Sequence, residues 1–268
     1  MNLRLLFFLF YCFGVSLQAQ ESIAYAPLEK SNDAFDVGEW FEFRIHYGIF
    51  NASFATLEVR ADTINQTPVF HAKGYGTTTG LARWFFKVED HYDTYFRKDT
   101  GLPMFFKRDI NEGGYTKNVE IRFDHEKGSA LVNNLKKKRK ESFEIRENSQ
   151  DLISVFYYLR NFYNTEELVK GESLGINMFF DQENYLFQLK FLGRENLNTK
   201  FGKVRCLKFR PVVQSGRVFR EEESVTIWVS DDPNKIPIKL RADLRVGAIE
   251  CDLENFKHLK HPFGLVLE

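Results

Sequence analysis

Apolar and polar residues alternate along most of this chain, with the period of two that a β-strand imposes on its side chains. In residues 40–47 aromatic and aliphatic side chains take every second position, while polar residues such as Arg44 and His46 take the others. Residues 115–123 and 185–191 show the same alternation. The pattern predicts antiparallel sheets with one dry face and one wet face. Further strands are expected at residues 54–61, 69–76, 84–96, 103–111, 130–135, 142–145, 204–210, 224–230, 236–244 and 248–256.

One segment in the middle of the chain departs from this alternation. In residues 150–163 the apolar positions recur at helical spacing from Leu152 to Tyr163. Asn148 or Ser149 can cap the first turn, because both residue types accept hydrogen bonds from free backbone amides. The sequence therefore predicts one mid-chain helix.

The two flanks of this helix resemble each other. Pro103 is followed by Asp109 and then a glycine, and the same pattern at the same spacing begins at Pro237. Gly-Glu pairs at residues 38–39 and 171–172 precede the two prolines by nearly the same distance and each opens a strand. The repeat predicts two related β-halves. Proline, aspartate and glycine suit turns and strand starts, so these residues are expected to serve the fold.

The fold expected from these patterns is mainly β and antiparallel. It consists of two related curved sheets or half-barrels that form one incomplete barrel, with one mid-chain helix. The expected organisation is a signal peptide (1–19), an N-terminal extension (20–36), a first β-half (37–147), a linking helix (148–165), a second β-half (166–258) and a C-terminal tail (259–268).

The first twenty residues have the layout of a cleavable signal peptide. Arg4 precedes an apolar run over residues 5–17, and Ala19 provides the small residue before the expected cleavage point. The run is shorter than the roughly 20 residues that span a bilayer, although an uncleaved anchor is an alternative. We therefore expect an exported protein, in the periplasm or associated with the outer envelope. It would be soluble after cleavage, without an integral membrane span.

Charge and composition narrow the range of binding partners that the sequence suggests. The chain has 37 basic and 37 acidic residues, so no net field favours nucleic acid. The basic run at residues 136–140 is expected at a solvated hairpin tip. Aromatic residues are abundant, with 28 Phe, 11 Tyr and 3 Trp, which suits a packed core and also an aromatic-lined pocket.

The chain resembles a family of bacterial secreted proteins known as the domain of unknown function DUF3108, from about Val37 to Phe256. The resemblance is carried by residues 38–39 with the strand after them, 80–86 leading to Asp90, 100–103, 151–152 and 228–237. It implies an envelope location and an antiparallel β-architecture, and no established activity.

A weaker similarity links the phrase at residues 99–103, Asp-Thr-Gly-Leu-Pro, to a hairpin of the periplasmic lipoprotein carriers. Those proteins are curved half-barrels closed by helices around an apolar cavity. The similarity implies that the dry face lines a groove for acyl chains or a lipidated partner, with the mid-chain helix as its plug.

Five residues are candidates for ligand contact. Arg83, Trp84, Phe85 and Phe86 follow one another, and alternation in a strand cannot turn all three aromatics toward the core. At least one is then left for a contact surface, although a buried barrel rim also explains them. Trp228 is the candidate in the second half.

Two sets of polar residues offer weaker alternatives for a functional site. Glu89, Asp90 and Asp93 could supply the acid and base of a hydrolase, although a wet strand face has the same appearance. His258 and His261 have the spacing with which a metal site begins on a helix, but no third ligand is identifiable. We expect neither a metal nor a cofactor.

Two cysteines lie outside the leader. Cys206 and Cys251 fall in expected strands, where they could form a disulfide in an oxidising compartment or remain as buried thiols.

The function expected from the sequence is a non-enzymatic binding or carrier module for an apolar ligand of the envelope, lipid or lipidated. A structural module that docks on envelope proteins is one alternative, and a secreted hydrolase using Glu89, Asp90 and Asp93 is the other. The oligomeric state is not predictable from these patterns.

Overall fold

The computed structural model describes residues 23–25, 30, 33–212 and 225–267. The expected signal peptide lies outside the described residues. Most of the described chain forms strands, which confirms the mainly β fold. Their bounds are β1 (Ile23–Tyr25), β2 (Trp40–Tyr47), β3 (Phe50–Ile64), β4 (Thr67–Thr78), β5 (Val88–Arg97), β6 (Pro103–Glu112), β7 (Tyr115–Asp124), β8 (Ser129–Asn134), β9 (Arg139–Glu144), β10 (Ser173–Phe180), β11 (Glu183–Thr199), β12 (Gly202–Val212), β13 (Val225–Ser230), β14 (Pro237–Asp243) and β15 (Ala248–Lys257). The helices are α1 (Gly80–Phe85) and α2 (Ser154–Phe162).

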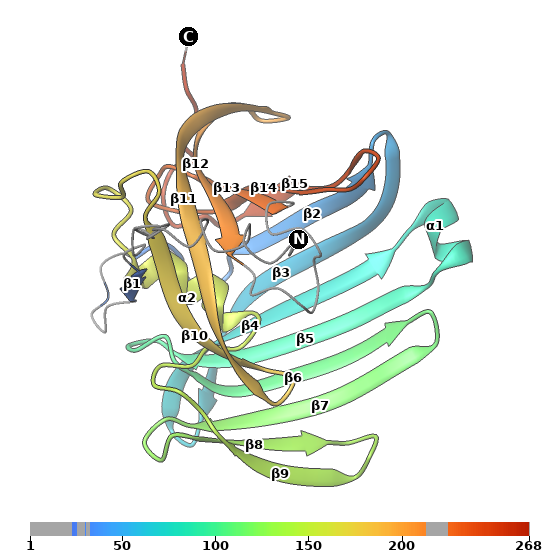
Figure 1. Ribbon diagram of the computed structural model, residues 1–268, viewed down its shortest axis with the longest axis vertical. Helices are drawn as coiled ribbons and strands as arrows, with labels where there is room; N and C mark the ends of the chain where they lie inside the picture. Colours follow the sequence, from blue (N-terminus) through green and yellow to red (C-terminus); the bar gives the residue numbers. More distant parts are fainter. Residues whose placement is uncertain (1–22, 26–29, 31–32, 213–224, 268) are drawn as a thin grey trace, which may run out of the picture.

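All of these strands belong to one curved sheet (Figure 1). Its order is β1-β10-β11-β12-β13-β14-β15-β2-β3-β4-β5-β6-β7-β8-β9, and every neighbouring pair is antiparallel except β1 and β10. The strands β10 to β15 form one meander and β2 to β9 form the other. Pairing of β15 with β2 joins the two meanders edge to edge, so the two expected curved sheets are continuous.

The same hydrogen bonds recur where each meander begins. The amide of Gly38 donates to the carbonyl of Val59 at 2.8 Å, and Gly171 donates in the same way to Phe191 at 2.8 Å. In both places the acceptor residue donates back to the glutamate that follows the glycine. The two glycines have φ values of +95° and +97°, a region that favours glycine. The two Gly-Glu pairs therefore form the same backbone hydrogen-bond pattern at the start of each meander.

The sheet curls until β10 and β11, far from the β15–β2 junction, approach β6, β7 and the segment after β9 without forming a continuous ladder with them. Asp181, at the turn between β10 and β11, accepts a hydrogen bond from Arg108 of β6 at 3.1 Å and forms an ion pair with Lys117 of β7. Gln150, after β9, forms an isolated bridge with Met178 of β10. Side-chain contacts and one isolated backbone bridge thus take the place of continuous strand pairing, which gives an incomplete barrel.

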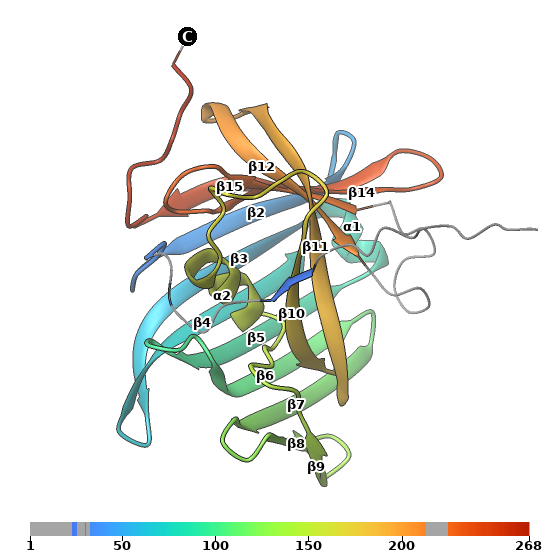
Figure 2. The ribbon, with the colours of Figure 1, turned by 60° about the vertical axis from the view of Figure 1, so that its left-hand side comes forward.

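Helix α2 lies inside the curve of the sheet and closes one end of it (Figure 2). Tyr157 packs against Phe70 and Phe96 in one apolar cluster, and Phe162 belongs to another. A Cβ on Gly101, at the turn between β5 and β6, would lie only 2.6 Å from the Phe162 ring. The glycine is required there because the helix approaches the backbone of that turn so closely.

Two sequence expectations about the helices need correction. Residues 84–87 are not strand: Gly80 has φ +54° and starts the short helix α1, and β5 begins only at Val88. The start of α2 is capped by Asp151 rather than by Asn148 or Ser149. Its Oδ1 accepts hydrogen bonds from the amides of residues 153 and 154, both at 2.8 Å.

A buried ion pair fixes α2 inside the sheet. Both guanidinium nitrogens Nη1 and Nη2 of Arg160 donate to the carboxylate of Glu39 at 2.6 Å, and both side chains are almost fully buried. The Nε of Arg160 donates to the carbonyl of Asn234 at 2.9 Å. Because Glu39 precedes β2 and Asn234 precedes β14, one side chain ties the helix to both meanders.

Removing one member of this pair should destabilise the protein strongly. We expect Arg160→Met or Glu39→Gln to lower the free energy of unfolding by about 3–5 kcal/mol, because the remaining charge or amide stays buried without its partner. The double variant Glu39→Met with Arg160→Met should cost less than the sum of the single changes. Denaturant unfolding measures each value. Lys127→Met, which removes an exposed ion pair with Asp124, is the control and should cost at most about 1 kcal/mol. A cost for Arg160→Met no larger than the control would contradict this account.

The cap of α2 should make stability depend on pH. Burial raises the pKa of Asp151 to about 6 from its usual value of 3.8, against its hydrogen bonds from backbone amides and Thr94. An acid whose pKa is raised by folding stabilises the protein below the unfolded value, and this contribution is lost as the pH rises through the folded value. Relative to Asp151→Asn, which keeps a neutral cap, the wild type should lose up to about 3 kcal/mol between pH 4 and 6. Asp151→Ala should cost about 1–2 kcal/mol through loss of the cap. Chemical unfolding across this range tests both, and a constant difference between wild type and the Asn variant would refute the pH effect.

Candidate functional site

An apolar cavity of about 190 Å³ lies between α2 and the strands β10 to β14. Its walls are aliphatic and aromatic side chains, among them Leu159 of α2, Leu189 of β11, Leu207 and Phe209 of β12 and Ile227 of β13. The cavity is on the concave side of the sheet, where the similarity to half-barrel carriers implies a groove.

The strand period of two builds these walls. Leu207 pairs with Val229 across β12 and β13, and Phe209 pairs with Ile227. Residues at alternate positions on paired strands share one face of the sheet, so these four side chains all point toward α2. The dry face expected from the sequence is therefore the wall of the cavity.

Three polar side chains also reach this wall: Arg160, Thr165 and Lys235. The guanidinium of Arg160 is fully paired, as described above. Lys235 is only 7% exposed, and within the described part of the chain its ammonium group has no hydrogen bond or ion pair. Burial lowers the pKa of this ammonium to about 8. The wall thus holds one cation that is paired, Arg160, and one, Lys235, that has no partner among the described residues.

The candidate contact residues of the first half lie away from the cavity. Trp84 and Phe85 of α1 are 88% and 87% exposed, and Phe86 is 54% exposed. Arg83 donates to the hydroxyl of Thr77 at 2.9 Å and lies on the same short helix. None of the four lines the cavity, and a contact role for them stays a prediction.

Trp228 is buried on the other face of β13. Its neighbours Ile227 and Val229 both line the cavity, so alternation turns the indole toward the convex side. There the indole N–H donates to Glu195, and the ammonium of Lys208 lies 5.3 Å from the ring centre. Four strands separate β13 from β4, which leads into α1, so the fold does not bring Trp228 and Trp84 to one site.

The acidic group proposed for a hydrolase does not converge. Glu89 pairs with Lys87 at 3.1 Å, and Asp93 accepts a hydrogen bond from His71 at 2.7 Å, both on the wet face of β5. Asp90 lies on the opposite face and accepts a hydrogen bond from the amide of Asn111 at 3.0 Å. With its members on two faces of one strand, the group has no common reaction centre.

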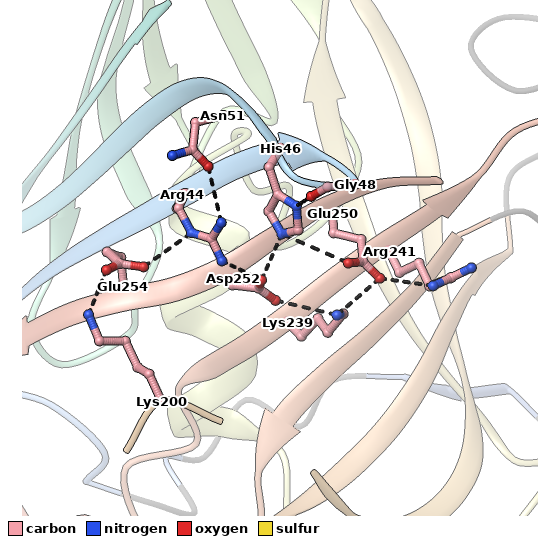
Figure 3. Close-up of polar contacts among 10 residues, drawn as sticks. All are labelled: Arg44, His46, Gly48, Asn51, Lys200, Lys239, Arg241, Glu250, Asp252 and Glu254. Carbon is pink, nitrogen blue, oxygen red and sulfur yellow. Dashed lines mark hydrogen bonds and ion pairs between the residues drawn. The ribbon is translucent and has the colours of Figure 1, made fainter. Parts of the chain in front are cut away.

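A second polar cluster lies on the convex side of β14, β15 and β2 (Figure 3). Nε2 of His46 lies 2.8 Å from Asp252 and 3.8 Å from Glu250, and within the described residues these three side chains are the one group close enough to share a metal ion. Lys239 approaches Glu250 at 3.0 Å and Asp252 at 3.5 Å.

Further basic side chains form ion pairs with the carboxylates of this cluster. Arg241 binds Glu250 at 2.9 Å, and Arg44 binds Asp252 at 3.3 Å. Lys200 completes the arrangement through an ion pair with Glu254. A divalent cation would have to displace these groups, so the residues fit a charge network better than a metal. Sequence reasoning missed the network because its members come from strands that only the β15–β2 pairing brings together.

The cysteines and the C-terminal histidines lie apart from these sites. Cys206 and Cys251 are free thiols, and burial raises the pKa of each to about 12. Two strands lie between β12 and β15, a separation of about 14 Å, whereas a disulfide needs Cα atoms about 4.4–6.8 Å apart. Of the two alternatives left open by the sequence, the structure therefore has the free thiols and not the disulfide. His261 hydrogen-bonds to the carbonyl of Asp33 at 2.8 Å, and His258 has φ +53° in the C-terminal segment.

The curved sheet, its internal helix and its apolar cavity define a β-barrel-like fold. The structure is similar to that of a β-barrel-like protein of the domain of unknown function DUF1849 from Brucella abortus, with a TM-score of 0.54, 9% identity and coverage of 85% of this chain and 100% of that one. The chain belongs to the family of proteins of unknown function DUF3108, whose model matches residues 42–254.

Two other solved structures share less of the geometry. A protein described as a candidate lipoprotein from Parabacteroides distasonis has a TM-score of 0.34 at 10% identity, covering 86% of this chain and 100% of its own. A candidate exported protein with a YmcC-like fold from Bacteroides fragilis has a TM-score of 0.31 at 10% identity, covering 84% and 100%. No curated protein matches the chain. Neither helix within the described residues is long and apolar enough to cross a bilayer.

Proposed function

We propose that this protein is a non-enzymatic carrier or binding protein for an apolar ligand of the cell envelope, lipid or lipidated. The observation that supports this function is the cavity between α2 and strands β10 to β14. Its surface is almost entirely hydrocarbon, and such a space favours occupation by apolar groups because burying them removes their surface from water.

The dimensions of the cavity limit what it holds. Ligand pockets for drug-sized molecules measure roughly 300–1,000 Å³. At about 190 Å³ this cavity suits one acyl chain or one part of a larger ligand. The buried ion pair of Arg160 holds α2 in place, so the wall is preorganised, which reduces the entropic cost of binding.

The envelope location rests on the expected signal peptide at residues 1–19. The hydrolase alternative has no support in the arrangement of Glu89, Asp90 and Asp93. The alternative of docking on envelope proteins has its candidate surface in the exposed residues of α1.

Filling the cavity should abolish ligand binding. Ile227 is half-buried on the cavity wall, and Ile227→Trp would place an indole where the ligand is expected. We expect the wild type to bind the neutral fluorescent probe N-phenyl-1-naphthylamine and the variant to bind it at least about tenfold more weakly, since the added ring occupies the space. Fluorescence titration measures both affinities.

The matched control is Leu131→Trp, which adds the same ring to an exposed position on β8 that does not line the cavity. Its affinity should stay within about twofold of the wild type. Organic extraction of the purified mature protein should also recover a bound lipid. A wild type that binds no probe and carries no lipid, or an Ile227→Trp variant that binds as well as the control, would overturn the proposed function.

A further inference from the structure

Lys235 is the one cation on the cavity wall whose partner is missing from the described residues. Arg160 shares the wall, but its guanidinium is satisfied by Glu39 and Asn234. A buried charge is costly unless it is paired. Because Lys235 lines the adjoining cavity, an anion bound there would supply the compensating interaction that the described residues do not.

The backbone holds Lys235 rigidly at the wall. It has φ +49°, an uncommon conformation for a residue with a side chain. Oδ1 of Asp232 accepts hydrogen bonds from the amides of Asn234 and Lys235, at 3.0 and 3.1 Å. The Asn234 amide group donates in turn to the carbonyl of His261 at 3.1 Å. The turn between β13 and β14 is thus held in a strained geometry that brings the lysine to the cavity.

None of the charged groups around Lys235 forms an ion pair with it in the described part of the chain. Glu166, Asp231 and Asp232 attract the ammonium at longer range, while Arg160 repels it. Asp232 and Asp231 have other partners, namely the turn amides and Arg205 at 2.9 Å. With a pKa of about 8 the ammonium is still mostly charged at neutral pH. A lysine side chain thus lines an otherwise apolar cavity.

We propose that the ligand is an amphiphile with a single apolar chain and an anionic end group, and that this end group binds Nζ of Lys235 while the chain fills the cavity. This inference rests on the proposed function. A carboxylate and a phosphate monoester share the required chemistry, since each accepts charge-assisted hydrogen bonds from an ammonium group. The hydrocarbon wall contacts the chain.

Ligands of equal chain length distinguish the contribution of the anionic end group to affinity from that of the apolar chain. Decanoate, decyl phosphate and decanol compete with N-phenyl-1-naphthylamine for the full mature protein. At neutral pH we expect at least one of the two anions to bind about tenfold or more tightly than decanol, because a charge-assisted hydrogen bond adds to the apolar contact. The stronger of the two anions identifies the end group. In Lys235→Met this advantage should vanish while decanol affinity is unchanged, and Lys235→Arg should restore part of it.

The pH dependence gives a second readout. An anion favours the protonated ammonium, so the affinity of the preferred anion should be constant up to about pH 8 and fall above it, whereas decanol should bind equally throughout. Lys127→Met removes an exposed lysine and is the control. Equal binding of decanol and both anions to the wild type, or an equal loss of all three in Lys235→Met, would overturn the anionic ligand and leave the apolar cavity standing. Failure of every ligand and of the neutral probe would overturn the proposed function itself.

The open end of the barrel, opposite α2, carries a set of exposed apolar side chains. Successive hairpins along the sheet meet there: the turns β14–β15, β2–β3, the α1 connection and the turn β6–β7, on the right-hand side of Figure 1. Each contributes large side chains that are more than half exposed, namely Val246, Ile49 and Phe50, Leu81 with Trp84, Phe85 and Phe86, and Tyr115. We call this set the apolar rim.

Basic residues lie at the same end of the barrel. The next hairpin along the sheet, β8–β9, turns at this end, and the lysines and arginine of residues 136–140 are exposed there. Arg245 adds a further exposed cation beside Val246. Tryptophan and other aromatics beside basic side chains are the combination that binds at the surface of an anionic bilayer.

We infer that the apolar rim docks on an anionic lipid surface, independently of what the cavity holds. Apolar side chains of the rim enter the headgroup region, and residues 136–140 contact anionic lipid through their charges. Charge complementarity favours a bilayer over a second copy of this chain, because two copies meeting rim to rim would bring their basic hairpins to one interface.

Vesicle co-sedimentation tests this surface. The mature protein should bind vesicles of phosphatidylglycerol and phosphatidylcholine mixed at roughly one to three about tenfold more strongly than phosphatidylcholine alone, with the difference reduced by salt. Trp84→Ser with Phe85→Ser should weaken binding about tenfold, since two exposed rings no longer enter the interface. Leu131→Ser, which removes an exposed leucine away from the rim, should not. Unchanged binding in the double variant, or a wild type that ignores vesicles and forms a dimer that the double variant abolishes, would overturn the inference.

Discussion

The architecture depends on the buried ion pair between Arg160 and Glu39. A curved sheet with a dry concave face cannot leave that face open to water, and α2 is the described element that covers it. Apolar packing alone would allow the helix to slide or rotate, because hydrophobic contact is non-directional. The two directional hydrogen bonds of 2.6 Å between Arg160 and Glu39 restrict the helix to one position. Since Arg160 also binds the carbonyl of Asn234, the same contact sets the relation between the two meanders at the closed end.

The internal repeat explains why this anchor exists only once. Glu39 and Glu172 follow glycines with the same φ and the same hydrogen bonds, yet their side chains differ in role. The carboxylate of Glu172 accepts a hydrogen bond from the amide of Val169 at 3.1 Å near the surface. A single helix fills the interior, so one of the two equivalent glutamates could become its partner while the other stayed a turn residue. The same glycine conformation and hydrogen-bond pattern occur in both halves because a strand begins at this point in each.

The strands, the mid-chain helix and the repeat followed from the sequence because each depends on local spacing. The aromatic run at residues 84–86 misled the same reasoning: three large apolar residues resemble a strand, but the left-handed backbone of Gly80 starts a helical turn instead. The cavity was implied only by the similarity to half-barrel carriers. Locating Lys235 on its wall requires the register of β12 and β13 and the position of α2, which arise from contacts far apart in the chain.

The two halves of the interior are filled differently, and this difference creates the site. Against β4 and β5, the rings of Phe35, Phe70, Phe96 and Tyr157 pack together, with distances of 4.7 to 6.2 Å between the centres of contacting rings, and form an aromatic core. Against β10 to β13, a mixture of aliphatic and aromatic side chains such as Leu207 and Phe209 faces α2, and the space between them remains open. Rigid packing on one side of the helix therefore supports a cavity on the other, since the helix cannot move to collapse it. The two meanders have similar backbone arrangements but present different side chains to α2. One face of the helix can therefore pack in a stable core while the other borders a binding site.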